Sequence, residues 1–165
     1  MFCEFKQDGS GFRIKTRPYT ETDLGAVAAL FTASVHELGA PHYSAVQREA
    51  WAPRPPDLGA WAIRLAELKT LLLFDESGLL GFIAYGDSGH IDLLFTSPKA
   101  ERRGVASSLF QQLERDLPGI ELFTEASLVA KPFFLRHGFC VTEMQQVVRG
   151  GVAFQRFAMR KAVAR

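Results

Sequence analysis

Three apolar runs follow one another in the middle of the chain, and they constrain the fold more than any other feature. They span residues 70–75, 79–85 and 90–96, and the turn sequences Glu-Ser-Gly and Gly-Asp-Ser-Gly separate them. Runs of this length between turn signals are typical of strands, and connections this short join antiparallel neighbours. The sequence therefore predicts an antiparallel meander at the centre of the chain.

An amphipathic helix is predicted soon after the third run. Its apolar residues recur at spacings of three and four, and Pro118 and Gly119 end the pattern. The apolar positions are Val105, Leu109, Phe110, Leu113 and Leu117.

Helices and strands are also predicted on both sides of this central part. Thr20 and Asp23 resemble a capping box before a helix that ends at Gly39, and Ser44 and Gln47 give a second capping signal. Gly150-Gly151 is typical of a hairpin turn. The other expected elements are a strand over 12–16, short helices through Trp51 and over 58–65, a strand over 120–125, a helix over 130–137, and strands over 139–149 and 152–159. Together they predict an α+β fold with a mixed sheet of six or seven strands.

Length, charge and cysteine content narrow the function. The 165 residues predict a single domain, 1–165, with residues 1–10 as a loose leader. A net charge of +1 gives no general attraction for nucleic acid or an anionic membrane. Cys3 and Cys140 form no disulfide framework, and neither a membrane-length apolar run nor a signal-peptide layout is present. A cytoplasmic location is expected.

The stretch from residue 96 to 108 has the composition of an anion site. Arg102, Arg103 and Gly104 stand where the amphipathic helix begins, and unpaired N–H groups at such a position attract anions. Ala106 permits close approach to the main chain, and Ser107 and Ser108 offer hydroxyl groups. Two other interpretations stay open: the arginines are solvated, or the glycine only eases a strand-to-helix turn.

The order of these segments resembles the GNAT superfamily of N-acetyltransferases. The residues that carry the resemblance are Leu-Leu-Phe-Thr-Ser-Pro at 93–98, Arg-Gly-Val-Ala at 103–106 and Ala-Lys-Pro-Phe-Phe-Leu-Arg-His-Gly-Phe at 130–139. Residues 42–53 and 151–159 resemble a narrower, YafP-like branch. The resemblance implies an α/β/α fold with a mostly antiparallel sheet that is splayed between its fourth and fifth strands.

The resemblance also implies acetyl-CoA as cosubstrate. Main-chain N–H groups of residues 103–107 would hold its pyrophosphate, the backbone of residues 94–96 would face the pantetheine arm, and the Leu94 N–H would bind the acetyl carbonyl oxygen. The implied cofactor-binding residues are Leu94, Phe95, Thr96, Arg102, Arg103, Gly104, Val105, Ala106, Ser107, Ser108, Ser127 and Phe133. A simpler interpretation is that Leu94 is a paired core residue.

Three positions depart from the family pattern. Glu101 places a carboxylate beside the proposed phosphate site, which would weaken CoA binding. Phe134 stands where a tyrosine commonly protonates the leaving thiolate, and Ser127 stands where an asparagine often braces the pantetheine.

Direct acetyl transfer needs a neutral amine, so a base is expected near the thioester. His90 and Asp92 are the preferred candidates, and strand alternation would place both on one face with Leu94 and Thr96. Tyr43 is a candidate acid, Glu125 is a further candidate for the proton chemistry, and Trp51 is a further residue of the acceptor pocket. Surface or core positions are the alternative for all of these. His36, His42 and His137 share no metal-ligand spacing, so no metal is expected.

These observations favour transfer of acetyl from acetyl-CoA to a primary amine of a small molecule. A catalytically weak acyl-CoA-binding or sensing module is the alternative, because of Glu101 and Phe134. Another phosphate ligand, such as a nucleotide, is disfavoured because the loop lacks the Gly-Lys-Ser/Thr ending of a P-loop. The acceptor stays open, and the final hairpin is compatible with a homodimer.

Overall fold

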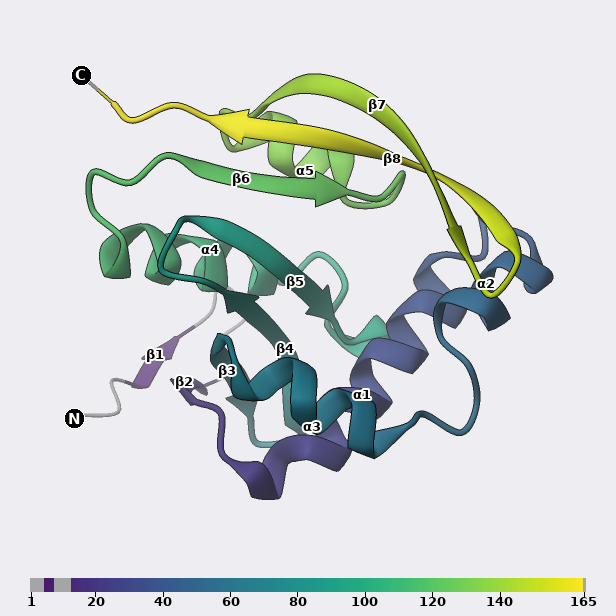
Figure 1. Cartoon of the computed structure of the whole chain (residues 1–165). Helices are drawn as coiled ribbons and strands as arrows, with labels where there is room; N and C mark the ends of the chain where they lie inside the picture. The colour runs from purple at the N-terminus through teal and green to yellow at the C-terminus, as the bar shows by residue number, and fades with distance from the viewer. Residues whose placement is uncertain (1–4, 8–12, 165) are drawn as a thin grey trace.

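The computed structural model describes residues 5–7 and 13–164, which form one mixed sheet with helices on both faces (Figure 1). The sheet order is β1-β2-β3-β4-β5-β6-β8-β7. The strands are β1 (Phe5–Gln7), β2 (Arg13–Pro18), β3 (Lys69–Asp75), β4 (Gly78–Tyr85), β5 (His90–Thr96), β6 (Leu122–Ala126), β7 (Cys140–Arg149) and β8 (Val152–Lys161). Among the described strand pairs, only β5 with β6 is parallel.

The predicted α+β fold is confirmed, and β2 to β8 are the seven strands expected. Short strand β1 adds an eighth at the edge, antiparallel to β2. It falls within the expected leader, whose residues 1–4 and 8–10 lie outside the described part of the chain.

Two hydrophobic cores cover the two faces of the sheet. Helices α4 (Val105–Asp116) and α5 (Lys131–Arg136) pack on one face, where Leu109, Phe110 and Leu113 are fully buried. Helices α1 (Leu24–Ala33) and α3 (Leu58–Ala66) pack on the other face, which Figure 1 shows toward the viewer. Each amphipathic helix therefore buries its apolar stripe against one side of the same strands.

The segment that follows β2 consists largely of successive helical turns. Short helix η1 (Glu21–Asp23) leads into α1, which continues as a π-helical turn, η2 (Ser34–Leu38), and α2 (Ala45–Trp51) follows. Ser44 and Gln47 form the predicted capping box of α2. The helix expected to end at Gly39 is thus confirmed, although its last turn is wider than an α-helical turn.

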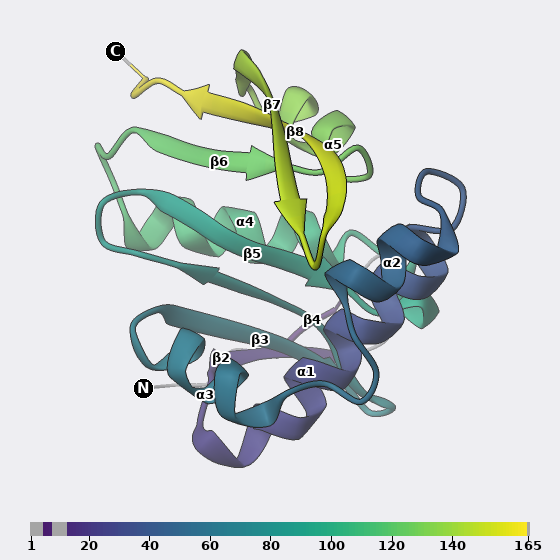
Figure 2. The ribbon, with the colours of Figure 1, turned by 45° about the vertical axis from the view of Figure 1, so that its right-hand side comes forward.

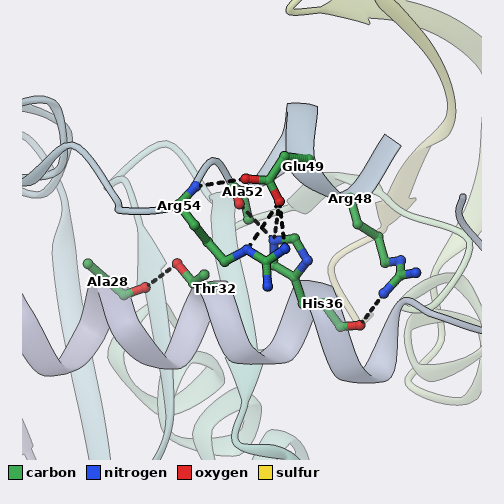
Figure 3. A network of polar contacts seen from close by, with 7 residues as sticks. All are labelled: Ala28, Thr32, His36, Arg48, Glu49, Ala52 and Arg54. Carbon is green, nitrogen blue, oxygen red and sulfur yellow. Dashed lines mark hydrogen bonds and ion pairs between the residues drawn. The ribbon is translucent and has the colours of Figure 1, made fainter. Parts of the chain in front are cut away.

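Polar contacts fix η2 against α2 (Figure 3). Arg48 donates to the His36 carbonyl oxygen at 2.7 Å, and His36 Nε2 lies 2.8 Å from the Ala52 carbonyl oxygen. Glu49 binds the Arg54 guanidinium at 2.8 Å and lies 3.7 Å from His36 Nε2. These contacts hold the π-helical turn and α2 in one fixed arrangement.

The β7–β8 hairpin extends toward α2, and its tip packs there (Figure 2). Gln47 of α2 donates to the Ala153 carbonyl oxygen at 3.2 Å, and a Cβ on Gly150 would lie 3.6 Å from the Ala50 Cβ. The hairpin thereby brings residues from the end of the chain beside η2 and α2.

Candidate active site

Strands β5 and β6 separate after two paired positions. The pairs are His90 with Phe123 and Ile91 with Thr124, whereas β5 continues to Thr96 and stays paired with β4 as far as Gly81. Residues 92–96 therefore have a strand neighbour on one side only. This is the splay that the family resemblance implied.

A β-bulge at Asp92 lies where the separation begins. Ile91 pairs with Tyr85 and Leu93 pairs with Ala84, so Asp92 is an extra residue in β5. Ile91 accordingly packs in the core under α4, and Leu93 packs in the core under α1. The bulge thus reverses the faces of the residues that follow it.

The expectation that His90, Asp92, Leu94 and Thr96 share one face is wrong for this reason. Asp92 accepts a hydrogen bond from Arg64 of α3, whereas Leu94 packs against the core under α4. Alternation holds only within an unbulged strand, so Leu94 and Thr96 face the side opposite to Asp92.

The backbone of β5 offers hydrogen-bonding groups to the gap. Ser97 donates its N–H to the Leu80 carbonyl oxygen at 2.7 Å, which identifies the alternate residues of β5 whose backbone groups hydrogen-bond to β4. Residues 93, 95 and 97 therefore direct their backbone groups toward β4, and Leu94 and Thr96 direct theirs toward β6, where pairing has ended. Polar backbone groups in such a place need a partner from solvent or ligand.

A cavity of about 230 Å³ occupies this gap and reaches both faces of the sheet. On the α4 and α5 side it is lined by Leu94, Thr96, Ala106, Thr124, Ala126, Ser127, Ala130, Phe133 and Phe134. On the α1 and α3 side it is lined by Phe31, Ser34, Val35, Tyr43, Trp51, Arg64, Asp92, Phe95, Glu125, Arg149, Phe154 and Arg156.

Helix α4 begins at an open, left-handed glycine. Gly104 is its N-cap with φ 73°, it provides no side-chain cap, and a Cβ there would meet no atom within 4 Å. Arg102 also has a positive φ, of 62°. The loop after η3 (Pro98–Ala100) thus leaves the first N–H groups of α4 accessible.

Two of the predicted loop residues have other partners. The Arg103 guanidinium donates to Asp75 at 3.0 Å, and its N–H donates to the Ala100 carbonyl oxygen at 3.3 Å. The Ser108 N–H donates to the Gly104 carbonyl oxygen, and Ser108 lines a second cavity, between α4 and strands β2 and β3. The structure therefore does not bring Ser108 to the gap.

The remaining loop residues are arranged as follows. Val105 is buried in the core, so only its backbone is available. The Ser107 hydroxyl lies 3.3 Å from His137 Nε2, and the His137 Nδ1 lies 2.9 Å from the Phe133 carbonyl oxygen. Glu101 is exposed. Main-chain N–H groups of residues 104–107 are therefore the main donors at this end of α4.

Ser127 lies in the turn between β6 and α5, and Phe133 and Phe134 lie within α5. Ser127 Oγ accepts the Ala130 N–H at 3.1 Å, and Phe133 stacks on His137 with ring centroids 4.1 Å apart. Phe134 is buried in the core. All three line the cavity.

The candidate acid–base residues form two pairs. His90 Nε2 lies 2.6 Å from the Glu125 carboxylate across the β5–β6 junction, and Arg64 binds Asp92 at 2.9 Å. Asp92 and Glu125 line the cavity, whereas His90 connects to it through Glu125. Strand spacing did not predict that pairing.

Tyr43 is buried within the cavity wall. Its hydroxyl oxygen accepts the Leu128 N–H at 2.8 Å, and burial raises the pKa of the Tyr43 phenol. A phenol that accepts this bond still has its own O–H to donate, and the Ser127 side chain is a further hydrogen-bond partner of Tyr43. Tyr43 therefore remains protonated near neutral pH.

Three arginines of the cavity were missed by the sequence analysis. Arg64 comes from α3, Arg149 from β7 and Arg156 from β8. No local motif marks them, because only the fold brings these segments together.

Comparison with known proteins identifies the family. Residues 39–161 match the family described as Acetyltransferase (GNAT) domain. The chain is 36% identical over 147 residues to the uncharacterized N-acetyltransferase YafP of Escherichia coli K12, covering 89% of this chain and 95% of YafP. This chain belongs to the GNAT acetyltransferase family. The resemblance to YafP-like members is confirmed as well.

Solved structures show the same GNAT fold. A GCN5-related N-acetyltransferase from Rhodopseudomonas palustris, described as aminotransferase class II, matches with a TM-score of 0.86 and 28% identity, covering 99% of this chain and 100% of that one. The PaiA N-acetyltransferase of Thermoplasma acidophilum, solved in complex with coenzyme A, matches with a TM-score of 0.69 and 21% identity, covering 90% and 98%.

Two further observations concern only the part of the GNAT chain that the structure describes. No helix there is long and apolar enough to cross a bilayer. No group of three or more His, Cys, Asp or Glu side chains there is arranged to hold a metal ion.

Proposed function

We propose that this protein transfers the acetyl group of acetyl-CoA to a primary amine of a small molecule by direct attack. The observation that carries the proposal is the continuity of the open backbone edge of β5 with the N-terminus of α4 at one cavity. The extended, amide-bearing pantetheine arm of acetyl-CoA fits the open edge of β5, and its diphosphate fits the N-terminus of α4.

The residues present fit such a cosubstrate. Accessible N–H groups of residues 104–107 and the exposed Arg102 suit a diphosphate, and Ala106 and Phe133 line the path from there to the gap. The Leu94 N–H is directed toward the gap and would bind the thioester carbonyl oxygen. An oriented donor of this kind lowers the barrier by about 3 to 4 kcal/mol as charge develops on that oxygen.

In the proposed reaction, the amine lone pair forms a C–N bond with the thioester carbon and the C–S bond breaks. The ammonium proton must leave before attack, and the Glu125–His90 pair takes it, because the carboxylate faces the cavity and the imidazole relays the proton to solvent. Asp92, held by Arg64, orients the amine. Tyr43 donates its proton to the leaving thiolate in place of the tyrosine that Phe134 replaces, and the second proton of the attacking nitrogen, lost as the amide forms, restores the Tyr43 O–H.

The test has two parts. Calorimetry with acetyl-CoA measures binding, and thiol release with a panel of primary amines measures transfer. Binding together with amine-dependent thiol release supports the proposal, whereas binding without release from any amine favours the sensing alternative. Absence of acetyl-CoA binding would refute both.

The remaining expectations stay predictions. They are a small-molecule amine as acceptor, a cytoplasmic location and a homodimer formed through the β7–β8 hairpin.

A further inference from the structure

The α3 side of the cavity carries more positive than negative charge. Arg64, Arg149 and Arg156 line it together with Asp92 and Glu125. Arg149 and Arg156 belong to the β7–β8 hairpin, whose tip packs on α2, so they come from a different part of the fold than Arg64 (Figure 2). The fold thus assembles three guanidinium groups around one opening.

Both carboxylates of the cavity already have a partner. Asp92 pairs with Arg64 at 2.9 Å, and Glu125 pairs with His90 at 2.6 Å. Within residues 13–164, no carboxylate lies within ion-pair distance of Arg149 or Arg156. Two positive charges therefore face the cavity with no carboxylate paired to them, and the nearest negative influence on Arg149 is the more distant Asp92.

The two unbalanced arginines are held by neutral groups. Arg156 donates its Nε–H to the Gln145 side chain at 2.8 Å, and the Arg149 guanidinium lies 6.0 Å from the centre of the Trp51 ring. Desolvation, followed by the charges of Arg64 and Arg156, lowers the pKa of Arg149. The positive charges of Arg64 and Arg156 repel that of Arg149, and a bound anion would relieve this repulsion.

We infer that the acceptor amine carries a carboxylate, which binds Arg149 and Arg156 while its amino group lies beside Asp92 and Glu125. Guanidinium groups bind carboxylates through paired N–H donors, which gives both affinity and orientation. The inference rests on the proposed function and names its substrate class. An apolar or aromatic body fits the walls between the two ends, which are formed by Tyr43, Trp51 and Phe154.

Matched pairs of amines test the inference. Benzylamine is compared with 4-(aminomethyl)benzoate, phenethylamine with phenylalanine, and butylamine with 4-aminobutyrate, by kcat/KM for thiol release. We expect at least a tenfold preference for the carboxylate in one pair or more. Equal rates within every pair, or a preference for the neutral amines, would overturn the inference and leave the proposed function intact.

A binding measurement distinguishes failure of the inference from failure of the proposed function. Thermal unfolding in the presence of CoA is measured with each amine, and the carboxylated member should raise the Tm more than its neutral partner, whether or not turnover occurs. Loss of turnover with this difference retained would count against the proposed function alone. No difference in any pair would count against the inference.

Substitutions then locate the carboxylate. Arg149→Gln and Arg156→Gln should each reduce the carboxylate preference at least tenfold. Arg160→Gln is the control, because Arg160 lies exposed on β8 and pairs with Glu121, and it should keep the wild-type rate and preference. Arg149→Glu should favour p-xylylenediamine over 4-(aminomethyl)benzoate, a gain that misfolding cannot produce. Unchanged preferences in all the cavity variants would overturn the inference.

Discussion

Replacing Gly104 by glutamate tests the proposed diphosphate site, and Gly119 provides a matched control. Both glycines are left-handed, with φ 73° and 74°, and a Cβ on either would meet no atom within 4 Å. Gly104 directly precedes the first turn of α4, and Gly119 lies just beyond its C-terminus. The two substitutions therefore impose the same local strain at opposite ends of one helix.

The expected effects differ in kind. A non-glycine residue in the left-handed region costs about 1–2 kcal/mol of stability in either variant. Near the N-terminus of α4, the new carboxylate would lie beside a diphosphate. Repulsion between this carboxylate and two phosphate charges, each at roughly 4 Å, costs about 2 kcal/mol even in a water-like dielectric, and salt reduces this cost. Gly104→Glu should therefore raise the acetyl-CoA Kd at least tenfold, about 1.4 kcal/mol.

Calorimetry with acetyl-CoA and urea unfolding measure the two effects. We expect similar losses of unfolding free energy in both variants, together with a wild-type Kd for Gly119→Glu. A Kd for Gly104→Glu within twofold of wild type would refute the assignment of the site. Equal weakening by both substitutions would show that strain in α4, rather than contact with the diphosphate, controls affinity.

Four further predictions concern catalysis and stability. Glu125→Gln and His90→Ala should each lower kcat at least tenfold without changing the acetyl-CoA Kd. The double variant should lose little more than either single variant, because the two residues act as one pair, and fully additive losses of kcat across the pH–rate profile would exclude a shared relay. Asp92→Asn should raise the amine KM more than it lowers kcat. Tyr43→Phe should lower kcat at least tenfold, because the phenol is the proposed acid. It should also cost about 1 kcal/mol of unfolding free energy, since it leaves a backbone N–H unpaired. A wild-type kcat for this variant would exclude Tyr43 as the acid. The Arg17 guanidinium, and then the hydrogen bonds that Thr20 donates, lower the pKa of the Asp23 carboxyl to about 2. This stabilisation is therefore present above about pH 4 and lost as the pH falls through 2. Asp23→Asn should cost about 1–2 kcal/mol at pH 7 and almost nothing well below pH 2 in urea titrations, and a pH-independent difference would contradict this.

Local signals predicted most of the fold. The turn residues at 76–78 and 86–89 separated three strands correctly, and the capping residues Ser44 and Gln47 marked the start of α2. These features depend on residues close in sequence, so a pattern of a few positions carries them. The same holds for the loop before α4, where Gly104 takes the conformation that only glycine adopts at low cost.

Other features depend on distant parts of the chain and had no local signal. The bulge at Asp92 arises from the pairing of β5 with β4, and no glycine or proline marks it, so the faces of Leu94 and Thr96 were predicted wrongly. The arginine cluster needs the β7–β8 hairpin to reach α2, which places Arg149 and Arg156 beside a helix far away in sequence. Sequence periodicity contains no such information.

A crystal structure with CoA tests the central claim most directly. The account predicts that diphosphate oxygens lie within hydrogen-bond distance of main-chain N–H groups of residues 104–107, and that the pantetheine amides bond to the backbone of Leu94 and Thr96 in the gap between β5 and β6. Coenzyme bound elsewhere, for instance in the cavity between α4 and strands β2 and β3, with the gap empty, would contradict it.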